Sequence, residues 1–276
     1  MKISTEIAGC SSFIGARKAI ELVAKAGFDA WDLSMFDLKI PGHPLASDNY
    51  HVIVREYKKI GEDNGIVCNQ SHAPFPSCAA GMEKLIIRAL ECTSLAGGKI
   101  CVVHPDNNKC AEENAEFYLM LLPIAKDIGV KIATENMWNW DEEKGHASKA
   151  ACSHHDDFLR HIKAVNDDYF VACLDIGHAE MKGLDTSAVQ MINTLKGHIK
   201  ALHIHDNDRW YDCHQLPYTM KIDFNAIIKA LHEIGYSGYF TLESDRYITC
   251  AEEVGAKIVQ MAKTARLMAC EFEKIN

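Results

Sequence analysis

The sequence predicts an α/β protein whose strands close into a (β/α)₈ barrel, and three observations support this. Short apolar runs alternate with longer amphipathic stretches eight times along the 276 residues, which favours parallel strands joined by helices. Eight strands close such a barrel, and about 250 residues is its usual size. No Pro- or Ser-rich linker or composition shift divides the chain, so we expect one domain over residues 1–276.

Each expected strand is a short run in which β-branched, aromatic and other apolar side chains dominate. The expected strands are Ile3–Ile7, Phe28–Leu33, Ile66–Gln70, Ile100–Val103, Val130–Thr134, Tyr169–Leu174, Ile199–Ile204 and Tyr239–Leu242. The expected helices are Ile14–Ala26, Asn49–Asn64, Met82–Leu95, Ala111–Ile128, His155–Val165, Thr186–Leu195, Phe224–Ile234 and Ala251–Ala269. Glycine follows four of these helical runs, at Gly27, Gly65, Gly129 and Gly235, where a left-handed C-terminal cap favours it.

The alternative architecture is an open, doubly wound sheet. That fold usually carries a glycine-rich phosphate loop after its first strand. Here the corresponding turn, Ala8–Phe13, has no G-x-G-x-x-G pattern. The closed barrel is therefore favoured, and the three longest loops, 34–48, 136–153 and 206–222, should all lie at the C-terminal ends of its strands.

Composition points to a cytoplasmic protein. The net charge of −9 works against binding to phosphate backbones or anionic membranes. The eleven cysteines form no Cys-x-x-Cys pair, and Cys68, Cys101 and Cys173 lie in strand-like runs, as buried thiols in a reducing compartment would. The N-terminus has no signal-like apolar core, and no apolar run approaches the roughly 18 residues of a membrane span.

Six of the strand-like runs end on side chains that bind metals. In chain order these side chains are His72, His104, Glu135, Asp175, His203 and Glu243. In a parallel barrel the C-terminal ends of all strands lie on one face, and that face carries the chemistry. The pattern therefore predicts a metalloenzyme with a pocket lined by carboxylates and imidazoles.

Glu135, Asp175, His203 and Glu243 form the strongest group, because they end the last four strands. Three carboxylates and one imidazole repel one another and desolvate poorly when packed without a cation. A divalent metal removes that problem, and this oxygen-rich set suits Mn²⁺, Mg²⁺ or Co²⁺ as well as Zn²⁺.

Further histidines stand where they could reach the same pocket. The spacing Asp175-x-x-His178 just past a strand can place both side chains in one pocket, with His178 as a substrate contact or a second ligand. A lone strand-end histidine is more often a structural hydrogen-bonding group than a ligand. As a pair on one rim, His72 and His104 could bind a second metal or a substrate.

The long loops add candidates of a weaker kind. Asp212-Cys213-His214 has a spacing that lets two ligands reach one ion from an extended segment, although a polar loop explains it equally well. Arg209 could hold an anion or hydroxyls with its planar guanidinium, or could be a surface charge. Trp138 could pack against the apolar face of a sugar ring or anchor its own loop.

Taken together, these motifs resemble the xylose-isomerase-like TIM barrel superfamily, which contains sugar and sugar-phosphate isomerases and epimerases and also endonuclease IV. The motifs are Ser71-His72-Ala73-Pro74-Phe75, Val103-His104-Pro105, Thr134-Glu135-Asn136, Leu174-Asp175-Ile176-Gly177-His178, His203-Ile204-His205-Asp206, Asp212-Cys213-His214, Ile222-Asp223-Phe224 and Leu242-Glu243. They follow the family's order over nearly the whole chain, and their combination identifies the superfamily rather than a substrate.

The resemblance implies a metal-dependent sugar or sugar-phosphate isomerase or epimerase that transfers a proton through a cis-enediolate. In the ketohexose 3-epimerase branch, the matching Glu135, Asp175, His203 and Glu243 bind one metal. Glu135 and Glu243 then act as the proton-transfer bases, while His178 and Arg209 hold the substrate. The expected partner is a small sugar, and homo-oligomers are common in the family.

The endonuclease IV branch gives the alternative, a zinc phosphodiesterase acting on abasic DNA. Its three-zinc site matches His72, His104, Glu135, Asp175, His178, His203, Asp212, His214 and Glu243. The net charge of −9 and the absence of a Lys/Arg-rich rim disfavour nucleic acid as a partner. The run 217–220 lacks the glycines that the family often has there. His205 stands where the family commonly has a lysine, so either His203 or His205 could be the metal ligand.

Overall fold

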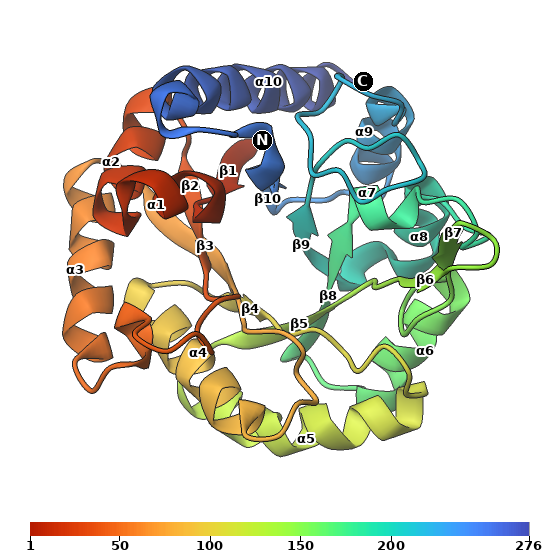
Figure 1. Cartoon of the computed structure of the whole chain (residues 1–276). Helices are drawn as coiled ribbons and strands as arrows, with labels where there is room; N and C mark the ends of the chain where they lie inside the picture. Colours follow the sequence, from red (N-terminus) through yellow and green to blue (C-terminus); the bar gives the residue numbers. More distant parts are fainter. Residues whose placement is uncertain (276) are drawn as a thin grey trace.

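The computed structural model describes residues 1–275 and confirms the (β/α)₈ barrel (Figure 1). Eight parallel strands lie in the order β10-β1-β2-β3-β4-β5-β8-β9. The first and last strands of this order, β10 and β9, also meet: a parallel bridge joins Ile204 to Leu242, and the Glu243 amide donates to the Ile204 carbonyl at 3.0 Å. The strands therefore form a nearly closed cylinder with helices on its outside.

The barrel strands are β1 Lys2–Glu6, β2 Ala30–Ser34, β3 Val67–His72, β4 Ile100–Val102, β5 Lys131–Glu135, β8 Phe170–Asp175, β9 Ile199–His203 and β10 Tyr239–Leu242. The α-helices are α1 Ala8–Ile14, α2 Ala16–Ala26, α3 Tyr50–Asp63, α4 Met82–Ala96, α5 Ala111–Asp127, α6 His155–Val165, α7 Ile176–Ala179, α8 Ala188–Leu195, α9 Phe224–Glu233 and α10 Val254–Lys274. Strands β6 Asn139–Asp141 and β7 His146–Ser148 pair as an antiparallel hairpin outside the barrel. Short 3₁₀ turns cover Pro44–Ala46, Lys196–His198, Asp245–Tyr247 and Ala251–Glu253.

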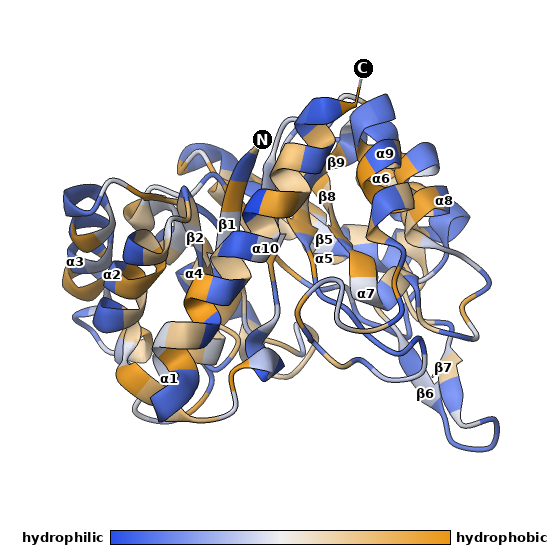
Figure 2. Cartoon of the chain, turned by 90° about the horizontal axis from the view of Figure 1, so that it is seen from above, coloured by the Kyte–Doolittle hydropathy of each residue, from blue (hydrophilic) through white to orange (hydrophobic). Residues whose placement is uncertain are grey.

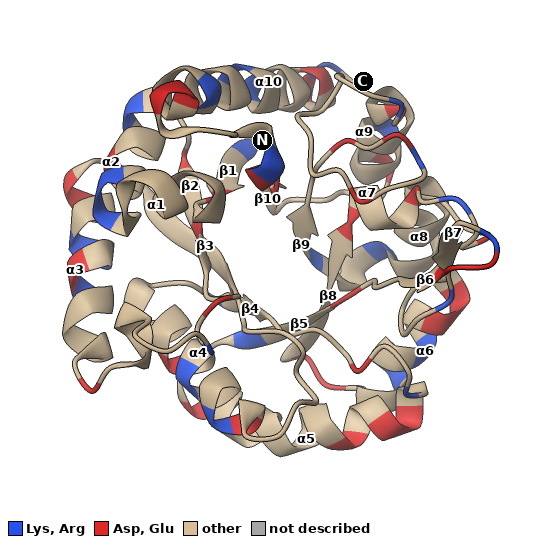
Figure 3. Ribbon diagram, in the orientation of Figure 1, with Lys and Arg blue, Asp and Glu red and all other residues tan. Residues whose placement is uncertain are grey.

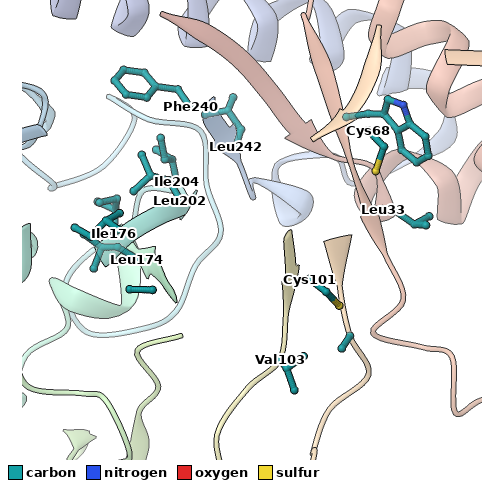
Figure 4. Close-up of a cluster of buried hydrophobic side chains, with 14 of the residues drawn as sticks. Leu33, Cys68, Cys101, Val103, Leu174, Ile176, Leu202, Ile204, Phe240 and Leu242 are labelled. Atoms are coloured by element: carbon teal, nitrogen blue, oxygen red, sulfur yellow. The ribbon is translucent and has the colours of Figure 1, made fainter. Parts of the chain in front are cut away.

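Two apolar layers hold the barrel together. Inside it, small side chains such as Ala133, Cys173 and Ala201 fill the narrow interior. Outside it, larger strand residues pack against the helices, and Figure 4 shows Leu174, Leu202 and others of this layer. Alternation of side chains along each strand produces both layers.

The helices are amphipathic, as their sequence periodicity predicts. Figure 2 shows helices that carry hydrophobic (orange) and hydrophilic (blue) stretches, and Figure 3 shows Lys, Arg, Asp and Glu distributed along the outer helices. In α2, Ala19, Ile20 and Val23 are buried while Lys18 and Lys25 are exposed. Burial of one helix face against the sheet is the main source of such a helix's stability.

Strand ends differ from expectation by one or two residues, and the difference matters for the site. Strands β3, β5 and β8 run on to His72, Glu135 and Asp175, so these side chains are the last of their strands. Strand β1 stops at Glu6 rather than at Ile7, which makes Glu6 a strand-end residue as well.

Helix α1, the single-turn helix α7 and the β6–β7 hairpin were not predicted. Helix α1 forms where we expected a turn, and it lacks both a side-chain N-cap and an apolar periodicity. Tertiary packing supports it: a Cβ on Gly9 would lie 2.7 Å from the Asp245 Cα, so only glycine allows this contact. The β6–β7 hairpin lies in the expected loop 136–153, where its strands are too short to give a periodic signal.

Residues 1–275 contain no disulfide, and Cys68, Cys101 and Cys173 are buried free thiols. No helix in this range is both long and apolar enough to cross a membrane.

Candidate metal centre and active site

The predicted donor residues gather at the C-terminal end of the barrel. Glu135, Asp175 and His203 are the last residues of β5, β8 and β9, and Glu243 follows β10 directly. The side chains of Glu135, Asp175 and His203 are at most 1% exposed. Parallel strand direction thus brings together residues more than 100 positions apart in the sequence.

His203 lies between the two glutamates. Its Nδ1 is 3.1 Å from Glu135 Oε1 and 3.4 Å from Glu243 Oε2. Burial raises the pKa of Glu243 well above its usual range. Burial acts the same way on Glu135, but His203 and His104 outweigh it and hold the pKa of Glu135 well below its usual range. One glutamate therefore favours its ionised form and the other its protonated form.

His72 and His104 extend this group on the other side of Glu135. Their Nε2 atoms are 2.9 Å apart, and His104 Nε2 is 3.1 Å from Glu135 Oε2. Burial lowers the pKa of His104 to about 4, with Glu135 opposing the shift, so its imidazole is neutral near pH 7. A neutral imidazole is the form that binds metals.

A second donor group adjoins the first. It contains His178, His205, Asp212 and His214, each of which offers a ligand atom within 4.8 Å of the others. His178 Nε2 is 3.5 Å from Asp212 Oδ2, and His214 Nε2 is 3.1 Å from the same oxygen. Burial favours neutral His178, but Asp175 and Asp212 outweigh it and raise its pKa to about 10.

Asp175 faces this second group more closely than the first. Its Oδ1 is 3.2 Å from His205 Nε2, and it accepts the His178 backbone amide at 2.7 Å. His205 in turn stacks on His214, with ring centroids 4.1 Å apart. The two histidines of the 203–206 motif are thus divided: His203 lies with Glu135 and Glu243, and His205 lies with Asp175 and Asp212.

Several buried polar atoms in both groups have no hydrogen-bond partner within residues 1–275. In the second group and beside it they include Asp175 Oδ2, Asp212 Oδ1 and both ring nitrogens of His205. In the first group, His203 Nε2 is also unpaired, but it is directed at Asp32 and not at the glutamates. Buried polar groups are normally paired, so unpaired oxygen and nitrogen donors that converge are suited to a cation. The donor types present therefore fit a divalent metal.

Glu135, Glu243 and Asp212 open onto a cavity of about 450 Å³, whereas Asp175, His203 and His205 are fully buried and do not line it. Phe36, Phe75 and Trp138 form an apolar part of its wall, and Phe36 and Phe75 stack with ring centroids 6.0 Å apart. His72, His104, His178 and His214 also line it. Trp138 therefore lines the cavity, where its ring could pack against a substrate.

Arg209 does not line the cavity. Its guanidinium donates to Glu180 Oε2 at 2.9 Å, and its side chain is 49% exposed. The basic residue that does line the cavity is Arg246, which donates to the Asp212 carbonyl at 2.6 Å.

The sequence analysis missed three carboxylates near the centre. Glu6 and Asp245 line the cavity, and Asp32 Oδ2 is 3.6 Å from His203 Nε2. Burial, together with Asp245 and Asp32, raises the pKa of Glu6 to about 8. Glu6 could have been recognised if the first strand had been ended one residue earlier, whereas Asp32 lies inside a strand and gave no end-of-strand signal.

Comparison with known proteins gives the chain's relationships. The family model for the xylose isomerase-like TIM barrel matches residues 20–266. An uncharacterized protein of Methanocaldococcus jannaschii, MJ1311, is 25% identical over 244 residues, which cover 82% of this chain and 78% of that protein.

Two solved structures illustrate the likeness in fold. A D-tagatose 3-epimerase-like protein is 21% identical with a TM-score of 0.75, covering 98% of this chain and 99% of that one. The IolI protein with a bound zinc atom is also 21% identical, with a TM-score of 0.74 and full coverage of both chains, 100% each. At this identity the likeness establishes the fold.

Proposed function

The chain belongs to the xylose isomerase-like TIM barrel family, and from that premise we propose that it is a divalent-metal-dependent sugar isomerase or epimerase. It would move a proton on a sugar carbon through a cis-enediolate. The observation that carries the proposal is the pair Glu135 and Glu243, which approach the same nitrogen of His203 from different strands beside a cavity. The epimerase-like and IolI neighbours support it at the level of the fold.

The proposed metal ligands are Glu135, Asp175, His203 and Glu243. Mn²⁺, Mg²⁺, Co²⁺ and Zn²⁺ all accept such oxygen and imidazole donors. When bound there, a divalent cation would polarise adjacent substrate oxygens and stabilise negative charge on them. His72, His104, His178, Asp212 and His214 would hold a further cation or contact the substrate.

The two glutamates would perform the proton transfer. Glu135, kept ionised by His203 and His104, can accept a proton, and Glu243, whose pKa burial raises, can hold one. Two titratable groups whose surroundings separate their pKa values are the usual sign of an acid–base pair. General acid–base help of this kind contributes roughly 10²–10⁴ in rate.

The cavity favours an unphosphorylated sugar. Its lining includes six acidic residues, Glu6, Asp37, Glu135, Asp212, Glu243 and Asp245, and Arg246 is the single lysine or arginine among the residues that line it within 1–275. Among these residues a phosphate would find a single guanidinium and no lysine to pair with. The wall formed by Phe36, Phe75 and Trp138 can pack against the apolar face of a sugar ring.

Exchange of sugar protons with D₂O tests the proposal. Purified protein with Mn²⁺ and a panel of unphosphorylated ketoses should incorporate deuterium at the carbon beside the carbonyl group. Glu243→Gln should slow this exchange by about 10²-fold or more because it loses the acid–base group. The control Glu233→Gln, on an exposed position of α9, should not change it. Sugar binding without exchange in the wild-type protein would instead indicate a sugar-binding protein.

A second candidate, a zinc phosphodiesterase acting on abasic DNA, rests on the proximity of the two donor groups. Histidines and carboxylates of the kinds that could hold several zinc ions line one cavity. Arg246 is the single lysine or arginine that lines this cavity within residues 1–275, which is a small basic contribution for binding a DNA backbone. Nicking of an abasic duplex by the zinc-loaded protein would support this candidate, and its absence at micromolar protein would dismiss it.

A further inference from the structure

We propose that the opposite end of the barrel carries an anion site for a small molecule with two or more phosphate groups. A hollow of about 250 Å³ lies there, where β4, β5, β9 and β10 begin. Four of the residues that line it are lysines: Lys99, Lys131, Lys196 and Lys200. This site does not depend on the sugar chemistry proposed for the C-terminal end.

The charge of this hollow is unusual for the chain. Acidic residues outnumber Lys and Arg by 38 to 29 overall, yet no Asp or Glu lines the hollow within residues 1–275. In the same range, Lys99, Lys196 and Lys200 form no ion pair with a carboxylate, in contrast to Lys126, which pairs with Asp167. Uncompensated like charges repel one another, and a bound anion would relieve that repulsion.

Lys131 shows how the cluster is held. Its ammonium donates to the Asp168 backbone carbonyl and lies 5.4 Å from the centre of the Tyr169 ring. Neither contact is with a carboxylate, but Lys131 helps to lower the pKa of Asp167, after Lys126. The uncompensated charge of the hollow therefore comes mainly from Lys99, Lys196 and Lys200. A larger hollow of about 660 Å³ shares Lys131, Lys196 and Lys200 and adds Lys163, and its lining also includes Asp167 and Asp168.

The remaining surface of the hollow suits the organic part of a ligand. Ile199, Ile234 and the buried ring of Tyr236 supply apolar surface. A Cβ atom added to Gly197 would have no other atom within 4 Å, so a ligand could approach the backbone closely at this glycine. Lysines act as point charges for phosphate, and four of them suit more than one phosphate group.

Size and surroundings exclude a long polyanion. A hollow of about 250 Å³ holds a small molecule, not a nucleic acid strand. The outer helices carry charges of both signs around the barrel (Figure 3). The net charge of −9 would also repel an extended polyanion at long range.

Calorimetric titration of the full chain with sodium triphosphate at low salt tests the site. We expect saturable binding of one triphosphate that weakens as salt screens the lysines. The triple variant K99Q/K196Q/K200Q should bind roughly tenfold more weakly or worse. The control K18Q/K25Q/K84Q removes the same charge from exposed helix positions and should bind like the wild type. Absence of saturable binding, or an equal loss in both variants, would overturn the proposal.

A measurement on the wild-type protein alone keeps the test valid if the triple variant does not fold. Lysine acetylation followed by mass spectrometry should slow at Lys99, Lys131, Lys196 and Lys200 when triphosphate is present. Acetylation of Lys18 and Lys25 on α2 should not change. Unchanged acetylation of the four lysines would contradict the site, whatever the result of the sugar-exchange experiment.

Discussion

At the scale of single residues, the candidate centre depends on how His203 is oriented. The imidazole is fully buried, its Nδ1 faces Glu135 and Glu243, and its Nε2 faces Asp32 at 3.6 Å. Burial lowers the pKa of His203, but Cys173 and the carboxylates of Glu243, Glu135 and Asp32 outweigh it and raise the pKa well above its usual range. A cation bound at Nδ1 would leave Nε2 directed at Asp32, the kind of outer carboxylate that fixes a ligand histidine.

Glu6 provides a prediction about pH. Its pKa rises from 4.5 to about 8 on folding, so its contribution to stability is fully present below pH 4.5 and is lost as the pH rises through 8. Glu6→Gln removes this titration. In metal-stripped protein, the difference in free energy of unfolding, variant minus wild type, should therefore rise between pH 4.5 and 8 by on the order of a few kcal/mol. Above pH 8 this difference should stay constant.

Denaturant unfolding at a series of pH values measures this difference. Glu233→Gln, at an exposed position, should give a difference from the wild type that hardly varies with pH. A flat difference for Glu6→Gln as well would mean that Glu6 is ionised in the folded protein.

The residues that could be predicted were those at the ends of strands. His72, Glu135, Asp175 and His203 end apolar runs, and a parallel barrel places all such ends on one face. The division of the donors into two groups could not be predicted, because it depends on side-chain directions across different strands. Arg209 was expected to hold the substrate, whereas its loop turns its side chain towards Glu180.

At the scale of elements, α7 fixes the second donor group. This single turn follows β8 directly, and the Asp175 side chain caps it by accepting the His178 amide. The turn aims His178 back at Asn136, whose carbonyl lies 2.9 Å from its Nδ1. Gly177 packs so closely against the His205 ring that no side chain fits between them.

Gly177→Ala should therefore displace His205 or the turn. Forcing an extra methyl group into packed surroundings costs about 1–3 kcal/mol, and chemical denaturation should show a loss of that size. The control Gly255→Ala adds the same methyl group in α10, where it meets nothing within 4 Å, and should stabilise by about 0.4–1 kcal/mol. Equal midpoints for Gly177→Ala and the wild type would contradict the close contact.

Elements with a strong periodic pattern were predicted to within a few residues. Helix α6, at His155–Val165, and strand β10, at Tyr239–Leu242, agree with expectation at both ends. Helix α1 and the β6–β7 hairpin were missed because packing and cross-strand pairing, not local sequence, stabilise them.

At the scale of the whole molecule, the two ends of the barrel carry different kinds of ionisable side chains. Carboxylates and imidazoles surround the cavity at the C-terminal end, and lysines surround the hollow at the N-terminal end. The barrel itself could be predicted because eight βα alternations leave few other topologies. The lysine hollow could not, since its members come from segments far apart in the sequence and follow no motif.

The central claim is that the C-terminal donor groups form a divalent metal centre. Metal content per chain, measured by mass spectrometry on protein purified without chelator, tests it most directly. We expect at least one equivalent of Mn²⁺, Co²⁺, Mg²⁺ or Zn²⁺, its loss in His203→Gln, and its retention in the exposed control His51→Gln. Two to three equivalents of zinc would add His72, His104, Asp212 and His214 to the ligands. No metal above background, even after the protein is reconstituted with each of these ions, would contradict the claim.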